Sequence, residues 1–336
     1  MNGSSFELQV SVLDLADLAS RLGVDMKNMK VNIWASKVAG STRTGLERLA
    51  GAKGMKLIGQ AVEFRITVST GSRSLEVKDF GGTYMVRAIV LEDVKAGGSY
   101  TAVVYDPSAS SLSFVPAVKG TRSDDKKQLS MRSPHNSIYA IMETTNRSFD
   151  DLIGHWAKDD VELLAAKQIV EGVSDTRFAP NGKITRAEFL ALLVRAMGLR
   201  TQADPTAQVF ADVPANAWFA SEVAAGVKAG LARGVTEERF DPNALVSREQ
   251  MALMLANALT LAGEPAKAGG YGYVLASFAD EEQVSPWARS AAERIAAAGI
   301  MRGTADGRML PKAFATRAEA ASTLKRLLLA VHFIDQ

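Results

Sequence analysis

Before residue 147, the pattern of hydrophobic and polar positions predicts both strands and short helices. In residues 1–72, strand-like stretches such as 61–68 are interspersed with helix-like ones, of which 13–22 is expected to end at Gly23. From residue 73 to 146, short strand patterns are separated by glycine and proline turns. We therefore expect an α+β module over 1–72 and a β-rich, sandwich-like module over 73–146.

Three details of this part are specific enough to check. Residues 6–12 alternate between apolar and polar and predict a strand. Residues 105–108 followed by 112–115 predict a β-hairpin. The charged stretch 119–127 predicts an exposed loop.

Beyond residue 147 the hydrophobic spacing becomes that of amphipathic helices, and the same pattern occurs three times. In each copy a tryptophan lies 30 residues before an arginine, and a glycine lies 16 residues after the tryptophan. The copies are Trp156, Gly172 and Arg186; Trp218, Gly234 and Arg248; Trp287, Gly303 and Arg317. The repeats span about 149–202, 210–263 and 278–334. One helical pair cannot bury its apolar face alone, so residues 147–336 are expected to form one all-α, pseudo-threefold bundle.

Each arginine follows a short motif that starts a helix. Thr185 with Glu188, Ser247 with Gln250, and Thr316 with Glu319 are capping boxes, in which hydroxyl and carboxylate or amide each bind a backbone N–H group. We expect these six residues mainly to begin their helices.

The arginines are less expected at these positions. A cation in the first helical turn opposes the helix dipole, at a cost of about 0.3–1 kcal/mol where it is exposed. Free backbone N–H groups beside a guanidinium form a carboxylate or phosphate site, so Arg186, Arg248 and Arg317 are candidate ligands for an anion. The alternative is that they pair with carboxylates of neighbouring repeats.

The tryptophans and glycines also allow two interpretations. The tryptophans favour a packing role at the start of each first helix, although an aromatic face can also stack on a sugar ring. The glycines most simply end helices, although they would also let a ligand approach the backbone closely. We include Trp156, Trp218, Trp287, Gly172, Gly234 and Gly303 among the candidate ligand-binding residues.

The segments 149–157, 210–218 and 278–288, each with its later Thr/Ser-Arg motif, resemble three S-layer homology (SLH) domains. The resemblance covers about residues 149–334, and residues 80–145 look like the β-rich module that often precedes such triplets. It implies a bacterial surface protein attached non-covalently to an acidic secondary cell-wall polysaccharide, typically through pyruvylated sugars held in grooves between repeats. It also implies that the three arginines bind the ketal carboxylate.

Composition narrows the remaining classes of function. Residues 1–147 carry 19 basic and 14 acidic side chains, and residues 148–336 carry 20 and 23. The repeats therefore lack a broad basic field, and nucleic acid is a poor candidate partner. No apolar run is long enough for a membrane span, so no membrane insertion is expected. The start of the chain lacks the layout of a signal peptide, and we expect an export signal on a longer precursor.

Other chemistry has little support in the sequence. Cysteine is absent, and the three histidines have no zinc-ligand spacing, so no metal site and no cofactor are expected. The adjacent acidic pairs Asp150-Asp151 and Asp159-Asp160 are typical of helix starts, where they compensate the dipole. A spatially assembled carboxylate pair remains open, but no motif identifies catalytic residues.

The leading hypothesis is a non-catalytic, cell-wall-binding anchor at the cell surface. The first alternative is the C-terminal anchoring part of a larger surface enzyme that degrades glycans. The second is a structural module that associates with copies of itself in a surface layer.

Overall fold

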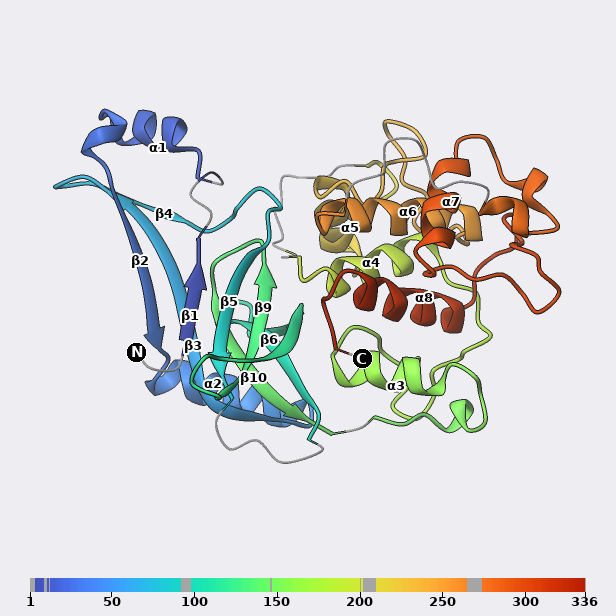
Figure 1. Cartoon of the computed structure of the whole chain (residues 1–336), viewed down its shortest axis with the longest axis horizontal. Coiled ribbons are helices and arrows are strands. Elements are labelled where there is room, and N and C mark those ends of the chain that lie inside the picture. Colours follow the sequence, from blue (N-terminus) through green and yellow to red (C-terminus); the bar gives the residue numbers. More distant parts are fainter. Residues whose placement is uncertain are drawn as a thin grey trace. The chain divides into compact units, whose positions relative to one another are not determined.

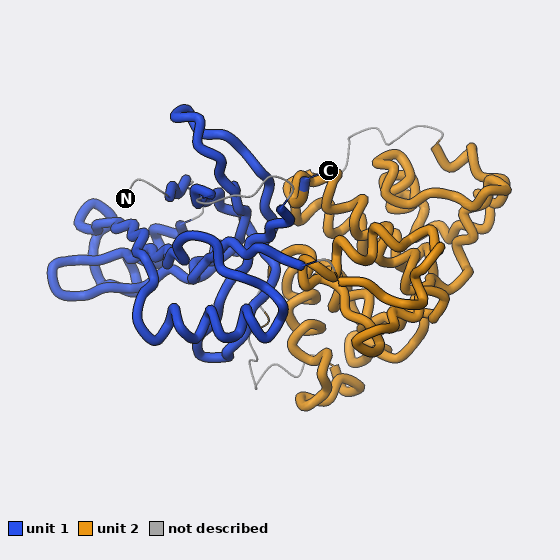
Figure 2. Tube along the Cα trace, turned by 90° about the horizontal axis from the view of Figure 1, so that it is seen from below, with its two compact units in different colours: residues 1–145, 335 blue, residues 146–334, 336 orange. Residues whose placement is uncertain are grey.

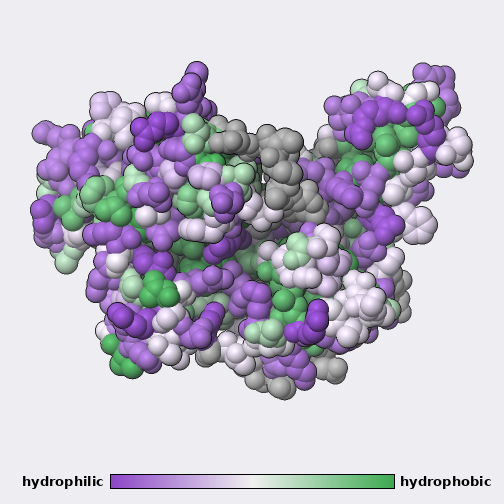
Figure 3. Space-filling model, turned by 180° about the vertical axis from the view of Figure 1, so that it is seen from behind, coloured by the Kyte–Doolittle hydropathy of each residue, from purple (hydrophilic) through white to green (hydrophobic). Residues whose placement is uncertain are grey.

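The computed structural model describes residues 4–8, 11, 13–91, 98–145, 147–199, 201, 210–264 and 274–335. Two compact units divide the chain between Thr145 and residue 146, as Figure 2 shows by colour. The first is rich in β-strands and the second consists of helices and loops (Figure 1). The described residues contain no helix that is long and apolar enough to cross a membrane. On the face drawn in Figure 3, hydrophobic residues form small groups among polar ones.

The first unit contains two antiparallel sheets. The smaller has the strand order β1-β5-β9-β8, and the larger has the order β2-β3-β10-β6-β7, with β4 also paired to β3. The strands are β1 (Ser4–Glu7), β2 (Lys30–Lys37), β3 (Met55–Ser69), β4 (Ser74–Val77), β5 (Met85–Val90), β6 (Tyr100–Asp106), β7 (Ser111–Val115), β8 (Ala117–Thr121), β9 (Lys127–Ser133) and β10 (Ile138–Thr144).

The core of this unit lies between the two sheets. Phe64 and Tyr139 of the larger sheet belong to the same buried cluster as Ile89 and Met131 of the smaller one. Helix α2 (Gly40–Ala52) covers the other face of the larger sheet and buries Leu46 there. Strand alternation thus places one apolar face inside the sandwich and a second under a helix.

The local predictions for this unit have mixed outcomes. Helix α1 (Leu15–Leu22) ends at Gly23 in the left-handed conformation, and β6 and β7 form the expected hairpin. Residues 119–127 were expected to be a loop, but their ends belong to β8 and β9, which pair with each other. The strand over 6–12 is present only as β1, and residues 9, 10 and 12 lie outside the described residues.

The separation at residues 72 and 73 does not appear in the structure. Strand β3 lies before it and β10 after it, and the two strands pair along their length. β1 likewise pairs with β5 across this position. Hydrogen bonds between distant strands, which local patterns do not reveal, make residues 1–145 one unit.

The second unit contains two helices from each repeat. These are α3 (Lys158–Ala166) and α4 (Arg186–Ala196), α5 (Ala220–Lys228) and α6 (Arg248–Leu261), and α7 (Arg289–Ala297) and α8 (Arg317–Ala330); the short 3₁₀ helices are η3 (Asp150–Leu152), η4 (Leu275–Ser277) and η5 (Glu281–Gln283). The second helices α4, α6 and α8 contact one another in the middle of the unit. Each also packs against the first helix of the following repeat: α4 on α5, α6 on α7, and α8 on α3.

A ring of three backbone hydrogen bonds joins the repeats just before the second helices. The Ile184 N–H donates to the Ala315 carbonyl, Ala315 N–H to Val246, and Val246 N–H to Ile184, at 3.0 to 3.1 Å. All three residues are buried. Each repeat therefore gives and receives the same contact, and the third repeat contacts the first as closely as the others contact each other.

Candidate functional site

The predicted capping boxes begin all three central helices. The Thr185 hydroxyl accepts from the Glu188 N–H, and the Glu188 carboxylate accepts from the Thr185 N–H at 2.8 Å. Ser247 with Gln250, and Thr316 with Glu319, make the same reciprocal pairs. This confirms their expected role as helix caps, and it fixes the place of the arginine that follows each cap.

Each of these arginines contacts the next repeat in the cycle. In Arg317, Nε donates to the Phe178 carbonyl at 2.9 Å and Nη2 to the Glu171 carbonyl at 2.8 Å. The guanidinium carbon also lies 4.7 Å from the centre of the Phe178 ring, within the range of a cation–π contact. Arg186 makes the equivalent contacts with the Phe240 and Arg233 carbonyls and the Phe240 ring.

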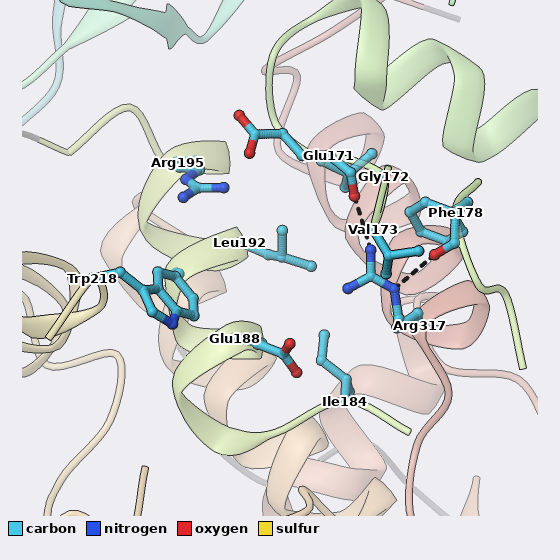
Figure 4. A pocket seen from close by; sticks show the side chains of 12 residues that line it. Glu171, Gly172, Val173, Phe178, Ile184, Glu188, Leu192, Arg195, Trp218 and Arg317 are labelled. Atoms are coloured by element: carbon cyan, nitrogen blue, oxygen red, sulfur yellow. Dashed lines mark hydrogen bonds between the residues drawn. The ribbon is translucent and has the colours of Figure 1, made fainter. Parts of the chain in front are cut away.

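Arg186 and Arg317 retain one free nitrogen each. Their Nη1 atoms make no hydrogen bond to the residues that the structure describes, and the Nη1 of Arg317 points toward the pocket in Figure 4. Burial lowers the pKa of both groups, because desolvation disfavours the charged form. A half-buried guanidinium with an unused donor is suited to an incoming anion.

Arg248 differs from the other two arginines. Its Nε and Nη2 donate to the carbonyls of Met309 and Arg302, and its Nη1 donates to Glu319 at 2.9 Å. Its side chain is only 6% exposed. The alternative in which the arginine pairs with a neighbouring carboxylate is therefore correct here, and Arg248 has no exposed donor for a ligand.

The expected free backbone N–H groups beside the arginines are not present. The N–H groups of Arg317 and Ala318 donate to the carbonyls of Gly182 and Pro180 in the first repeat. The equivalent groups after Ser247 and Thr185 are satisfied in the same way by the following repeat. The part of the anion-site prediction that relied on free backbone N–H groups is therefore wrong, and any anion binding here depends on side chains.

A groove lies at one of these arginines, and we name it the first groove. It lies between Arg317, the loop 170–178 and helix α4.

The first groove is a pocket of about 300 Å³. Its lining includes Arg317 of the third repeat, Trp218 of the second repeat, and Glu188, Leu192 and Arg195 of helix α4 (Figure 4). One groove therefore combines side chains from all three repeats. A concave site that combines apolar, aromatic and charged side chains is typical of binding sites for small polar ligands, such as a sugar ring.

The tryptophans are exposed. Trp156, Trp218 and Trp287 have 62, 58 and 54% of their surface accessible, so the packing role favoured by the sequence is wrong. Trp218 lines the first groove. An exposed indole beside a charged group can present its face to a sugar ring.

The glycines do not end helices. Helices α3, α5 and α7 end at Ala166, Lys228 and Ala297, and the repeat glycines follow several residues later. A Cβ on Gly172 would lie 2.6 Å from the Phe149 ring and from the Arg177 carbonyl. Gly234 and Gly303 lie equally close to the rings of Phe210 and Phe278. Close packing of the groove loop requires glycine at these positions, and Gly172 also lines the first groove.

Sequence reasoning missed the aspartates that hold the groove loops. Asp151 accepts hydrogen bonds from the N–H groups of Phe178 and Ala179, both at 2.8 Å. Asp212 and Asp280 bind the equivalent loops of the second and third repeats. They fix the loops at Ala179, Asp241 and Leu310, which have positive φ angles. Asp151 therefore holds a loop in place and does not serve to compensate a helix dipole. The signal available in the sequence was that an aspartate stands a few residues before the tryptophan in every repeat.

Replacing Asp151 by asparagine should lower the free energy of unfolding by about 1–3 kcal/mol, because two hydrogen bonds to a charged acceptor are weakened. Burial alone would raise the pKa of Asp151, but the loop N–H groups bring it below the ordinary value of about 3.9. The stabilisation is therefore complete above that value and is lost as the pH falls through the lower, folded-state pKa. Urea unfolding at several pH values measures it.

The neighbouring exposed Asp150 provides the control for this measurement. Asp150→Asn should change stability little, and the difference between the wild type and Asp151→Asn should shrink as the pH falls through the lowered, folded-state pKa of Asp151. Equal losses for the two variants at neutral pH would contradict the role given to Asp151.

The described residues contain no group of three or more histidine or acidic side chains placed to hold a metal ion.

Comparisons with known proteins agree with this arrangement. The family model of the S-layer homology domain matches residues 148–190, 209–252 and 277–321. An amylopullulanase of Thermoanaerobacterium thermosulfurigenes is 32% identical over 224 residues, which are 67% of this chain and 12% of that protein. Exoglucanase XynX of Acetivibrio thermocellus is 34% identical over 54% of this chain and 16% of its own length.

A third relative comes from a different class. The surface-layer 125 kDa protein of Lysinibacillus sphaericus is 32% identical over 52% of this chain and 14% of its own length. The chain thus spans between about an eighth and a sixth of these three relatives. The three segments that the family model matches lie in the helical unit, and each contains the capping box and the arginine that crosses to the next repeat. The chain is therefore an S-layer homology domain protein, with three tandem domains that follow a β-rich unit.

Proposed function

We propose that this chain is a non-catalytic anchor that attaches a surface protein to an acidic cell-wall polysaccharide. The observation that carries the proposal is the first groove, which places the exposed Trp218 and Arg317, from the second and third repeats, beside a loop of the first repeat. Membership in the S-layer homology family supports a role in anchoring at the cell surface.

The chemistry of the first groove supports a sugar ligand. An indole face covers the apolar side of a sugar ring, while carboxylate and guanidinium groups bind its hydroxyls and acidic substituents. The first groove offers Trp218, Glu188, Arg195 and the free Nη1 of Arg317 within one pocket. A single pyranose unit fits a volume of about 300 Å³, which favours recognition of one residue of the polymer.

The larger context of the chain is the second part of the proposal. Two relatives are named as an amylopullulanase and an exoglucanase, and this chain matches 12 and 16% of their lengths. We infer that the anchor can serve an enzyme that degrades glycans and is held at the cell surface. The names of other relatives, such as the S-layer protein EA1 of Bacillus anthracis, favour a part in a surface layer as the competing role.

The test is co-sedimentation of the full chain with purified bacterial wall sacculi. A variant with Trp156, Trp218 and Trp287 changed to alanine should lose most of its binding, because exposed indoles contribute to the ligand and little to the fold. Wild-type binding should also disappear when acid strips the polysaccharide from the sacculi. The fraction of protein in the pellet measures both effects.

Trp34→Ala is the matched control, because Trp34 is 56% exposed but belongs to the first unit. It should bind walls like the wild type. Binding that survives both the triple change and acid stripping would overturn the proposed anchor. A chain that forms ordered arrays but does not bind any wall would favour the surface-layer role.

A further inference from the structure

Strand β2 (Lys30–Lys37) is the outer strand of the larger sheet in the first unit (Figure 1). It pairs with β3 along its whole length, and no described residue pairs with its other edge. The N–H of Val38, directly after β2, donates to the Ala61 carbonyl of β3 at 2.9 Å. Hydrogen bonds alternate along an antiparallel pair, so the even-numbered residues of β2 bond to β3, while the odd-numbered residues direct their N–H and C=O groups outward.

The odd-numbered residues also carry the apolar side of β2. Val31 and Ile33 lie opposite Val68 and Ile66 of β3, which are fully buried in the core. Yet 40% of Val31 and 49% of Ile33 are exposed. The core face of the larger sheet therefore extends one strand beyond the elements that cover it. A strand added beside β2 would cover part of both side chains and bind the outward N–H and C=O groups.

The two ends of β2 indicate the charge of such a strand. Lys30 and Lys37 are exposed and have no acidic partner among the described residues, whereas the neighbouring Arg65 is paired with Glu63. Lysine on an edge strand discourages pairing with a like strand. Because both ends of β2 carry lysine, two copies of β2 would bring like charges together at both ends in either orientation. A segment with carboxylates at its ends has the complementary charge.

We propose that the edge of β2 is a docking site for an extended acidic segment of a partner protein, which adds to the larger sheet as a further antiparallel strand. Apolar residues at alternate positions of this segment lie beside Val31 and Ile33, and carboxylates at its ends lie opposite the two lysines. The backbone hydrogen bonds give affinity, and the side chains and end charges give selectivity. The site belongs to the first unit and does not depend on wall binding by the second.

The test uses the full chain and a synthetic peptide with blocked termini, in which three valines alternate with three threonines between two terminal aspartates. One control peptide has lysines in place of the aspartates. Another has proline in place of the central valine, because proline cannot donate a hydrogen bond to β2. Amide hydrogen exchange, measured residue by residue with nuclear magnetic resonance, is the readout.

The expected result is an alternating pattern of protection. At a concentration about ten times its Kd, the acidic peptide should slow exchange about tenfold at the outward N–H groups of Val31, Ile33 and Ala35. Exchange at Trp34, whose N–H group faces β3, should stay unchanged. The proline peptide should protect none of these residues.

Reversing the charge of both ends tests the selectivity without altering the backbone edge. Lys30→Glu combined with Lys37→Glu should weaken the acidic peptide about tenfold, because two attractive pairs become repulsive, and should strengthen the lysine peptide. The fold should persist, since both side chains are exposed. Lys53→Glu combined with Lys56→Glu is the matched control, because it makes the same change of charge at the far end of β3 and should leave both affinities unchanged.

Three results would overturn the proposal. The first is that the acidic peptide protects none of the outward N–H groups, or protects Trp34 as strongly as Ile33. The second is that the double reversal at Lys30 and Lys37 leaves the order of the two peptides unchanged. The third is protection of the same N–H groups at rising protein concentration without peptide, which would assign the edge to a second copy of the chain.

Discussion

Replacing Arg248 by alanine is expected to lower the free energy of unfolding of the helical unit by about 3–5 kcal/mol. The guanidinium is almost fully buried, and its three nitrogens bind two carbonyls and Glu319. Its removal leaves these acceptors unsatisfied at the contact between the second and third repeats. Urea unfolding followed by far-ultraviolet circular dichroism, to which the helices contribute most, measures the change.

Arg186→Ala is the comparison for this experiment. Arg186 binds two carbonyls and no carboxylate and is only half-buried, so its loss should cost about 1–2 kcal/mol. Similar losses at the two positions would contradict the special role of the Arg248–Glu319 pair. A large loss at Arg248 also means that reduced wall binding by Arg248→Ala would report on folding, which is why the wall-binding test above uses the tryptophans.

Gly172→Ala is expected to be the most damaging small substitution in the first groove. Its Cβ would come within 2.6 Å of the Phe149 ring and the Arg177 carbonyl, and it would also overlap the Ser174 carbonyl. Backbone atoms cannot move aside as a side-chain end can, so the groove loop must shift. Overpacking of this kind costs about 1–3 kcal/mol or more and should also weaken wall binding.

Gly51→Ala controls for the loss of glycine itself. A Cβ there meets nothing within 4 Å, and the residue lies inside helix α2, so alanine should stabilise the first unit by about 0.5–1 kcal/mol. Thermal unfolding and wall co-sedimentation of both variants provide the comparison. Unchanged stability in Gly172→Ala would show that the loop tolerates displacement and that glycine is not required.

The features that the sequence predicted well depend on neighbours in the chain. The capping boxes of Thr185, Ser247 and Thr316 are local devices, since cap and partner lie three residues apart, and the structure confirms them. The hairpin of β6 and β7 is local in the same sense. Repetition of spacing also marked the three family-matched segments.

The features that were missed depend on contacts between distant residues. The burial of Arg248 follows from Glu319, which lies 71 residues later, and no local pattern indicates that pair. The tryptophans were expected to pack at the start of each first helix, yet more than half of the surface of each is exposed.

The exchange of contacts between the first and third repeats also imposes an order of events on biogenesis. Arg317 completes the first groove by binding Phe178 and Glu171, which precede it by 139 and 146 residues. Closing such a long loop costs conformational entropy that only the assembled interface offsets. A nascent chain in which only two repeats have been synthesised therefore has an incomplete first groove. The groove can form only after Arg317 has been translated.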